Sequence, residues 1–380
     1  MWLFPPMENI FYPNTEKQNH LPADSLQNMS DFECLKEIKL LKNELQHKLA
    51  LLGHHYQNDD IISFADFTGD SLKLSQQSAN LNKEHIVFCG VHFMAETTDI
   101  LCQPEQKVYL PDLNAGCTMA DMAQIDQVES AWKIINQVLE NKQKVIPITY
   151  INCTADLKAF VGRNDGCICT SSNAEKIISW AFEQGQKLFF FPDQHLGRNT
   201  CFDLGIPLDQ MVVYNPNKTN GGLTEEQIRD AKVFLWAGHC SVHQGFKIEQ
   251  IDYFRKHEPE TKIIVHPECS FDVFNNADDA GSTAYIINTI QNAPAGSSFA
   301  VGTENNLVNR LADSFPHLTV KSLSPFQCLC TTMYRIRPKW LLKTLQDIKI
   351  GNNQSPNIIK VDEGVKELAL LAINRMLELS

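Results

Sequence analysis

The feature that most constrains the fold of this chain is a series of landmarks that occurs three times with similar spacing. In each series a short apolar run ends in polar residues and is followed by a hydroxyl-bearing turn, a second strand end and a cysteine. The first and third series show separations of 17, 19 and 27 residues and of 17, 19 and 28 residues. Such regularity predicts three copies of one supersecondary unit. The landmarks are His54, Ser71, Gly90 and Cys117; Tyr150, Ser171, Pro192 and Cys240; and His266, Thr283, Gly302 and Cys330.

The apolar runs have the length of strands and alternate with helical stretches, which is typical of βαβ units with a parallel sheet. We therefore expect an α/β protein in which three homologous three-layer α/β repeats with parallel sheets surround a pseudo-threefold axis. The middle series is stretched to 21, 21 and 48 residues. Its surplus includes a stretch rich in Gly, Asn and Pro at 215–222, which we interpret as a loop.

The landmarks also predict where the chain divides. We expect a surface helix at 129–141, in the second repeat. The last residues should form a helical segment that packs back on the first repeat. The predicted parts are an N-terminal extension (1–33), the first repeat (34–117), the second repeat (118–240), the third repeat (241–330) and the C-terminal segment (331–380).

Composition excludes some classes of partner and compartment. The net charge of -12 argues against nucleic acids and anionic membranes as partners, because both bind basic surfaces. The N-terminus lacks the pattern of a secretory signal, and the apolar runs are far shorter than the roughly 20 residues of a membrane span. We expect a cytoplasmic protein without a membrane partner. Its 12 cysteines should then be thiols or metal ligands rather than disulfides.

Polar side chains stand where the predicted strands end. Open parallel sheets bind ligands beyond these carboxyl ends, so we expect one active site at the central junction of the repeats. A carboxylate such as that of Glu268 would be a plausible general base there. The alternative is that His266 and Glu268 merely satisfy buried donors and acceptors. The residues concerned are His54, Tyr56, Tyr150, Asn152, His266 and Glu268.

One cysteine closes each repeat at an equivalent position. Three such thiolates, Cys117, Cys240 and Cys330, would suit an iron–sulfur cluster whose fourth iron stays open to a substrate oxygen. A single buried cysteine is more often structural, but the shared position favours ligands. Zinc is a further alternative, with His239 or His243 beside Cys240, although zinc sites usually show close ligand pairs that are missing here.

The hydroxyl-bearing turns are candidate anion sites. Ser71, Ser171 and Thr283 each stand near the start of a predicted helix, where free N–H groups and the helix dipole favour negative charge. Each hydroxyl could instead be an ordinary N-cap. Three such turns at one cavity would suit a phosphate and several carboxylates.

A dozen ordered segments from Gly53 to Met333 resemble those of bacterial quinolinate synthases, and the chain resembles the long form of that family. The resemblance implies a transferase that condenses iminoaspartate (iminosuccinate) with dihydroxyacetone phosphate in de novo NAD biosynthesis. The products would be quinolinate, phosphate and water. The segments are GHHYQ, ADFTGDSL, FCGVHFMAETTDIL, PDLNAGCTMADM, TYINCTADLKA, CTSSNA, FFPDQHLG, WAGHCSVH, HPEC, AGST, VGTEN and CTTM.

The resemblance also implies a cofactor and a set of site residues. One [4Fe-4S] cluster per chain would act as a Lewis acid, with Cys117, Cys240 and Cys330 as ligands and one open iron. An L-aspartate oxidase that supplies the unstable imine is implied as a functional partner. The implied substrate contacts are His54, Ser71, Tyr150, Ile151, Asn152, Ser171, His266, Pro267, Glu268 and Thr283. For catalysis we assign Glu268, His54, Tyr56 and Tyr150.

The sequence departs from the family pattern at two places. His55 replaces a tyrosine, whereas Tyr56 is retained. Cys328-Leu329-Cys330 replaces a longer cysteine run, so Cys328 competes with Cys330 as the third ligand, and the spacing to Met333 favours Cys330. Two rival functions are another [4Fe-4S] hydro-lyase acting on a small polycarboxylate and an iron-sensing protein. The latter would require an interaction surface or basic element that the sequence does not suggest.

Overall fold

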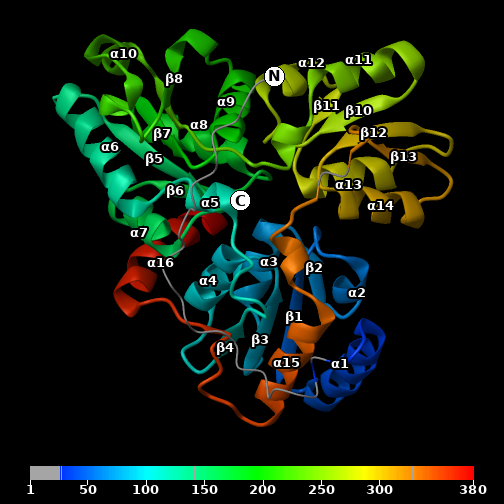
Figure 1. Ribbon diagram of the computed structural model, residues 1–380. Helices are drawn as coiled ribbons and strands as arrows, with labels where there is room; N and C mark the ends of the chain where they lie inside the picture. The colour runs from blue at the N-terminus through cyan, green and yellow to red at the C-terminus, as the bar shows by residue number, and fades with distance from the viewer. Residues whose placement is uncertain (1–25, 27, 141, 327–328) are drawn as a thin grey trace, which may run out of the picture.

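Three separate β-sheets, each with helices packed against it, meet around a common centre in the computed structural model (Figure 1). The structure describes residues 26, 28–140, 142–326 and 329–380. The first unit is blue to cyan in Figure 1, the second is green, and the third is yellow to orange. The predicted α/β class with three parallel-sheet units is thereby confirmed.

The first unit follows helix α1 (Asp31–Leu45) and has four parallel strands in the order β2-β1-β3-β4. A short strand from the C-terminal segment, β14 (Ile358–Ile359), extends this sheet antiparallel to β4. The elements of the unit are β1 (Leu49–His54), α2 (Asp59–Ile62), β2 (Phe67–Gly69), α3 (Ser71–Ser78), β3 (His85–Cys89), α4 (His92–Leu101) and β4 (Lys107–Tyr109), followed by α5 (Thr118–Asp121).

The second unit follows helix α6 (Ile125–Val138), which starts four residues before the predicted surface helix; residue 141 lies outside the described residues. Its strand order is β6-β5-β7-β9-β8, all parallel. The elements are β5 (Val145–Tyr150), α7 (Ala155–Arg163), β6 (Cys167–Cys169), α8 (Ala174–Gln184), β7 (Lys187–Phe191), α9 (Gln194–Asp203), η1 (Leu208–Gln210), β8 (Met211–Tyr214), η2 (Thr219–Gly222), α10 (Glu225–Asp230) and β9 (Val233–Trp236), followed by η3 (His243–Gly245).

The third unit follows helix α11 (Ile248–His257) and has the parallel strand order β11-β10-β12-β13. In every unit the second strand in sequence pairs with one edge of the first strand, and the third pairs with its other edge; the fourth strand follows the third in the first and third units, whereas β9 follows β7 in the second. The elements are β10 (Lys262–Val265), α12 (Phe271–Asn276), β11 (Asp279–Ala280), α13 (Thr283–Gln291), β12 (Ser298–Gly302), α14 (Asn305–Ser314) and β13 (Thr319–Ser322), followed by η4 (Met333–Arg335) and α15 (Pro338–Lys349).

The long interval of the second unit, between Pro192 and Cys240, contains regular structure as well as a loop. The stretch 215–222 contains turns and η2, but β8 precedes it and α10 follows it. Strand β8 pairs with β9 along its whole length, from Met211 opposite Val233 to Tyr214 opposite Trp236. The surplus residues therefore add a fifth strand and a helix to one edge of this sheet.

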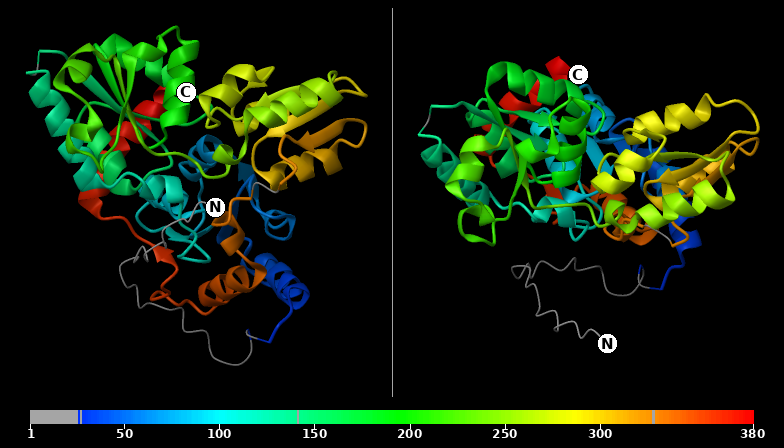
Figure 2. Two further views of the ribbon diagram at one scale, coloured as in Figure 1. Left: turned by 45° about the horizontal axis from the view of Figure 1, so that its top comes forward. Right: turned by 90° about the horizontal axis from the view of Figure 1, so that it is seen from above.

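The C-terminal segment divides between two units. Helix α15 packs against α1, and β14 joins the first sheet. The last helix, α16 (Glu363–Leu379), packs instead against α7 and β6 of the second unit, so the expectation that the whole segment returns to the first repeat was wrong (Figure 2). The apolar face of α16 is buried there, at Ala369, Ala372, Ile373 and Met376.

Apolar packing joins the units unequally. One continuous core runs through the first and second units and includes the face of α16. The third sheet has its own apolar clusters on its two faces. Helix α1 begins with a capping box on Ser30 and Glu33, inside the predicted extension, whose residues 1–25 and 27 lie outside the described part. No helix among the described residues combines the length and apolarity that crossing a bilayer requires.

Candidate active site

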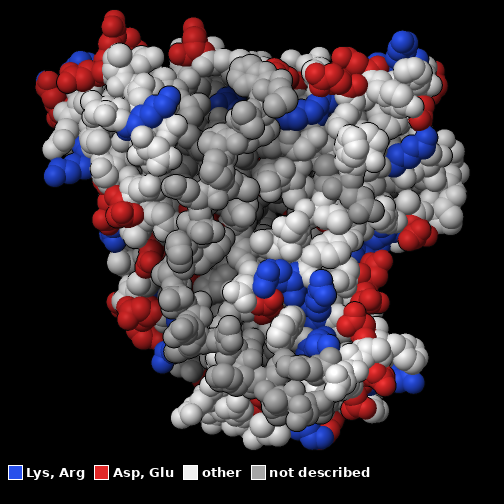
Figure 3. Space-filling view, viewed as in Figure 1, with Lys and Arg blue, Asp and Glu red and all other residues white. Residues whose placement is uncertain are grey.

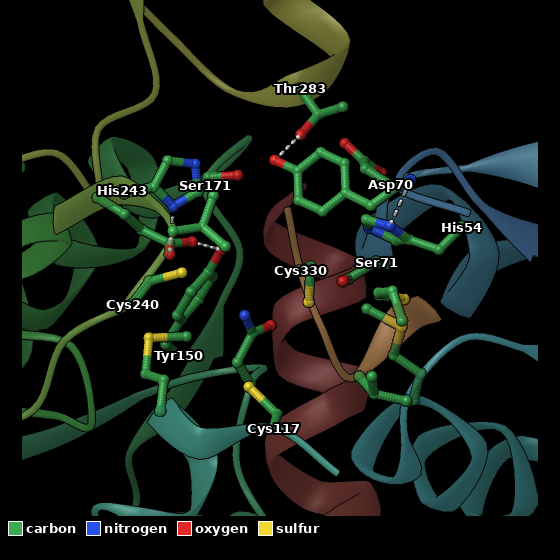
Figure 4. Close-up of a pocket in the computed structure, with 18 of the residues that line it drawn as sticks. His54, Asp70, Ser71, Cys117, Tyr150, Ser171, Cys240, His243, Thr283 and Cys330 are labelled. Carbon is green, nitrogen blue, oxygen red and sulfur yellow. Dashed lines mark hydrogen bonds and ion pairs between the residues drawn. The ribbon is translucent and has the colours of Figure 1, made fainter. Parts of the chain in front are cut away.

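A pocket lies where the three units meet, beyond the carboxyl ends of their parallel strands (Figure 4). The space between its lining atoms, with its open mouth, amounts to about 660 Å³. Its walls therefore come from segments far apart in the sequence. The residues expected from the sequence that line it are His54, Tyr56, Ser71, Cys117, Tyr150, Asn152, Ser171, Cys240, His266, Glu268, Thr283 and Cys330.

Two side chains at alternate positions line the pocket where the first strand of each unit ends. These positions are 54 and 56, 150 and 152, and 266 and 268. In each pair the intervening residue, at 55, 151 or 267, does not line the pocket. Ile151 and Pro267, which were expected to contact substrate, are the intervening residues of the second and third pairs. The side chain of Ile151 is buried, and the carbonyl of Pro267 accepts a hydrogen bond from Asn199.

His54 and His266 occupy equivalent positions and have the same tautomer. Nδ1 of His54 accepts the N–H of Tyr56 at 3.2 Å, and Nδ1 of His266 accepts the N–H of Glu268 at 3.3 Å. The proton of each neutral ring is then on Nε2. Burial lowers the pKa of both imidazoles from 6.5 to about 3. At neutral pH both rings are therefore uncharged donors in the pocket wall.

Glu268 is buried and held by groups from the second and third units. Tyr150 donates a hydrogen bond to Oε1 at 2.6 Å, and Nδ1 of His243 lies 3.1 Å from Oε2. Figure 4 labels Tyr150 and His243. Burial tends to raise the pKa of Glu268, but His243, His266 and the two hydrogen bonds outweigh it, and the pKa falls below its ordinary 4.5. The side chain is a carboxylate at neutral pH.

A chain of hydrogen bonds runs from Glu268 to the first unit. Nε2 of His243 lies 3.4 Å from the hydroxyl of Thr303, which lies 3.0 Å from the hydroxyl of Tyr56. That phenol also lies 3.1 Å from the hydroxyl of Thr283. Sequence reasoning missed Thr303 and considered His243 only as a zinc ligand. Its signals in the sequence were its position three residues after Cys240 and its place at the end of the segment WAGHCSVH.

The hydroxyls of Ser71, Ser171 and Thr283 are not N-caps of the helices that follow them. Asp70 caps α3 and Ser282 caps α13, so Ser71 and Thr283 are the first residues of their helices. Their hydroxyls are thus free of the capping role and line the pocket. Asp70 also lines the pocket and accepts a 2.8 Å hydrogen bond from Ser172 of the second unit. Sequence reasoning missed Asp70 and also Thr170, another lining residue.

Cys117, Cys240 and Cys330 bring one thiol from each unit to the pocket (Figure 4). All three are partly exposed, as is Cys102, whereas the other described cysteines are buried. Cys328 lies outside the described residues. Each of the three begins the same tight turn, because its carbonyl accepts the N–H of the residue four positions later, at 3.0, 3.0 and 3.2 Å.

Backbone N–H groups of these turns approach the sulfur atoms. They come from Met119 and Ala120 for Cys117, and from His243 for Cys240. Thr332 and Met333 supply them for Cys330. Burial nevertheless raises the pKa of Cys117 to about 12, so the bare thiol keeps its proton. Thiols that need a cation to ionise, with N–H groups aimed at sulfur, suit an iron–sulfur cluster.

Part of the zinc alternative has a geometric basis. Ligand atoms of Cys240, His243 and Glu268 all lie within 4.8 Å of one another. However, His243 and Glu268 are hydrogen-bonded to each other, and Glu268 also accepts the Tyr150 proton. These hydrogen bonds would have to break for both side chains to bind a metal, whereas the side-chain contact of Cys330 is with the Thr332 hydroxyl, which is not among the candidate ligands.

The charge of the pocket differs from that of the exterior. Figure 3 shows Lys, Arg, Asp and Glu around the rims of the units. Among the described residues that line the pocket there is no Lys or Arg, and Asp70 and Glu268 are the carboxylates. An anion in this pocket would be bound by neutral N–H and O–H donors, with any further attraction supplied by a metal centre.

A pocket of thiols, imidazoles, phenols and two buried carboxylates, built between three α/β units, defines an enzyme site for small polar molecules. Comparison with known sequences specifies the family. The profile of the quinolinate synthetase A protein family matches residues 36–378, and the chain belongs to this family.

Curated relatives match the chain over nearly its whole length. Quinolinate synthase of Anoxybacillus flavithermus is 52% identical over 362 residues, which cover 95% of this chain and 97% of the relative. Quinolinate synthase of Herpetosiphon aurantiacus is 52% identical over 363 residues, with coverages of 95% and 96%. Quinolinate synthase of Halalkalibacterium halodurans is 50% identical over 371 residues, with coverages of 97% and 99%.

Proposed function

We propose that this chain is a quinolinate synthase that condenses iminoaspartate with dihydroxyacetone phosphate and releases quinolinate, phosphate and water. Relatives of that name at about half identity over nearly the whole chain support the activity. The observation that carries the proposal further is that one cysteine from each unit reaches the same pocket as Glu268. A site of this kind combines metal ligands with a carboxylate that can move protons.

The substrates are anions, and the pocket offers neutral donors for them. The Nε2–H groups of His54 and His266 and the amide of Asn152 would bind carboxylate oxygens. The side-chain oxygen Oδ1 of Asn152 is buried without a hydrogen-bond partner in the described structure. It could therefore accept a hydrogen bond from a donor group of a bound substrate. The hydroxyls of Ser71, Ser171 and Thr283 would hold the remaining carboxylate and the phosphate.

Glu268 is the proposed base. Its carboxylate is ionised and buried, so it can take a proton from a substrate carbon or nitrogen and return it to a leaving hydroxyl. Tyr150 and Tyr56 remain protonated, because burial raises the pKa of both phenols above 10. Tyr150 orients Glu268 through its hydrogen bond, and Tyr56 with His54 would donate to oxygen atoms of the substrates.

The proposed cofactor is one [4Fe-4S] cluster held by Cys117, Cys240 and Cys330. When bound, it supplies a Lewis acid at its open iron, which polarises a carbon–oxygen bond for dehydration. We favour Cys330 over Cys328 because Cys330 begins the same turn as the other two cysteines. The three cysteines would then close units that end at 117, 240 and 330.

We also propose a cytoplasmic location, which would keep the thiols reduced, and functional coupling to an L-aspartate oxidase that supplies the imine. The rival hydro-lyase activity is less well supported, because the curated relatives quoted above carry the quinolinate synthase name.

The decisive experiment is an anaerobic assay of the purified, cluster-loaded chain. Iminoaspartate generated by an aspartate oxidase is mixed with dihydroxyacetone phosphate, and quinolinate and phosphate are measured. We expect equal amounts of both products. Absence of quinolinate from a chain with a full complement of iron and sulfide would refute the proposal. Dehydration of a hydroxypolycarboxylate under the same conditions would favour the hydro-lyase, and zinc in place of iron would refute the cluster.

A further inference from the structure

The segment formed by residues 54–57 carries two pocket side chains of the first unit, His54 and Tyr56. Its backbone is a tight turn in which the N–H of Gln57 bonds to the carbonyl of His54 at 3.0 Å. The N–H of Tyr56 bonds to the ring of His54. These bonds fix the internal shape of the segment, and its placement against the third unit depends on other contacts.

Helix α14 of the third unit binds three consecutive carbonyls of this segment. Nη1 of Arg310 donates to His55 at 2.8 Å, and Nη2 donates to Gln57 at 2.6 Å. The side-chain amide of Asn306 donates to the carbonyl of Tyr56 at 3.1 Å. Nε of Arg310 also donates to the carboxylate of Asp59 at 2.7 Å. One guanidinium therefore uses all three of its nitrogens on residues of the first unit.

The Tyr56 side chain, which faces the pocket, also contacts the third unit. The phenol of Tyr56 contacts the hydroxyls of Thr283 and Thr303. Both threonines belong to the third unit, whose apolar clusters are separate from the core that the first and second units share. The Tyr56 side chain packs against this core and against one cluster of the third unit, so the 54–57 segment makes apolar as well as polar contacts across the junction.

We propose that Arg310 is a positioning residue that holds the 54–57 segment against the third unit and so places His54 and Tyr56 at the reacting molecules. Arg310 does not line the pocket and is not a catalytic residue. Its planar fork, with charge-assisted hydrogen bonds, fixes two carbonyls at once, which the single ammonium of a lysine reproduces poorly. The role in catalysis rests on the proposed function, whereas the clamp itself does not.

The chain contains a matched control in Arg255. This arginine donates to both carboxylate oxygens of Asp278 at 2.9 and 2.7 Å, and it reaches the carbonyl of Asn276 at 3.4 Å. All of these contacts lie within the third unit. Arg255→Ala therefore removes an arginine with similar bonds but leaves the junction intact. Asp59→Asn is a second control, since it removes the exposed ion pair of Arg310 and leaves the bonds to the carbonyls.

The experiment compares the cluster-loaded Arg310→Ala, Arg310→Lys, Arg255→Ala and Asp59→Asn variants with the original chain. Amide hydrogen exchange of residues 54–57 is measured together with iron content and the rate of quinolinate formation. For Arg310→Ala we expect normal iron, faster exchange in this segment and a rate lower by about 100-fold, the loss typical of a misplacement near 1 Å. Arg310→Lys should lie between this variant and the original chain. Added ethylguanidinium should restore part of the Arg310→Ala rate, whereas the two controls should behave like the original chain.

Several results would overturn the proposal. Unchanged exchange of residues 54–57 in Arg310→Ala would show that the clamp does not hold the segment. Loss of iron in both Arg310 variants would show a general structural role instead. If the original chain contained iron but formed no quinolinate, the proposed function would fail, and the exchange measurement would still decide whether Arg310 holds the segment.

Discussion

The phenol of Tyr150 donates a 2.6 Å hydrogen bond to Glu268, and this bond joins the second α/β unit to the third inside the pocket. The two residues do not occupy equivalent positions in their units. Tyr150 is the first landmark of the second unit, whereas Glu268 lies two residues after His266, the first landmark of the third unit. The acidity of the candidate base therefore depends on how two units are placed relative to each other.

Replacing Glu268 should abolish most of the activity without removing the cofactor. Glu268→Gln keeps the size of the side chain and its ability to accept the Tyr150 proton, but it removes the base, and losses of about 10²–10⁴-fold are typical of such changes. Quinolinate formation and the visible absorbance of the cluster are measured together. Glu258→Gln, at an exposed ion pair with Lys321 of the same unit, is the control. Substantial activity in Glu268→Gln would contradict the assignment.

Replacing Tyr150 should alter the pH dependence of the reaction. The Tyr150 hydrogen bond lowers the pKa of Glu268, so its loss in Tyr150→Phe should raise that pKa and move the acid limb of the rate profile to higher pH. The profile of kcat against pH checks this. Tyr253→Phe, at an exposed tyrosine, should leave the profile in place. An unshifted limb in Tyr150→Phe would mean that the group titrating in the profile is not Glu268.

His266 should make the folded state sensitive to acid. Its pKa is lowered from 6.5 to about 3, so the unfolded chain binds a proton that the folded chain does not bind as the pH falls below 6.5. Stability is thus full above pH 6.5 and is lost progressively toward pH 3, by about 2 kcal/mol at pH 5.

The matching variant is His266→Asn, whose side-chain oxygen can still accept the N–H of Glu268. We expect its anaerobic melting temperature to fall less between pH 7 and pH 5 than that of the original chain. His317→Asn, at a surface histidine of the same unit, should retain the original pH dependence. An equal fall in all three proteins would contradict the prediction.

The three pocket cysteines should be required for iron. Cys117→Ser, Cys240→Ser and Cys330→Ser should each lose most iron and acid-labile sulfide after anaerobic reconstitution, because each removes one of three thiolate ligands. Cys269→Ser, at a buried cysteine outside the pocket lining, is the control and should retain both. Cluster retention in Cys330→Ser together with loss in Cys328→Ser would transfer the third ligand to Cys328.

The contact between α7 and α16 should tolerate no side chain at Gly162. A Cβ there would lie 1.9 Å from the backbone oxygen of Leu368, which belongs to α16. Gly162→Ala should therefore destabilise the protein by about 1–3 kcal/mol through overpacking. Gly364→Ala, in α16, would meet only the Asp362 carboxylate, at 3.2 Å, and should destabilise the protein much less than Gly162→Ala. Thermal unfolding distinguishes the two, and equal melting temperatures would count against the close packing.

The sequence predicts well what recurs along the chain. Strong apolar runs marked β1, β5 and β10, and the spacing after them indicated three parallel-sheet units. The short edge strands β2, β6 and β11 were missed because two or three residues carry no periodicity. Strand β8 was missed because the Gly- and Asn-rich stretch that follows it, 215–222, led to the prediction of a loop in this part of the second unit.

The contacts between side chains of different units were the main feature of the site that could not be predicted from the sequence. His243, Thr303 and Arg310 gain their importance from partners in distant segments, and neither spacing nor residue type reveals such pairs. Ile151 and Pro267 were predicted to contact substrate because each lies inside a motif, and their side chains do not line the pocket, whereas those of the residues on either side do.

The position of α16 has a consequence for the order in which the protein assembles during synthesis. The first sheet is completed by β14, and the core that the first and second units share is completed by α16, so both depend on residues made after the third unit. The third sheet is built from one continuous stretch, 262–322, and its apolar clusters contain no residue of β14 or α16. Although domains generally fold in the order of their synthesis, the third unit can therefore complete its sheet and its apolar clusters before the core of the other two is complete.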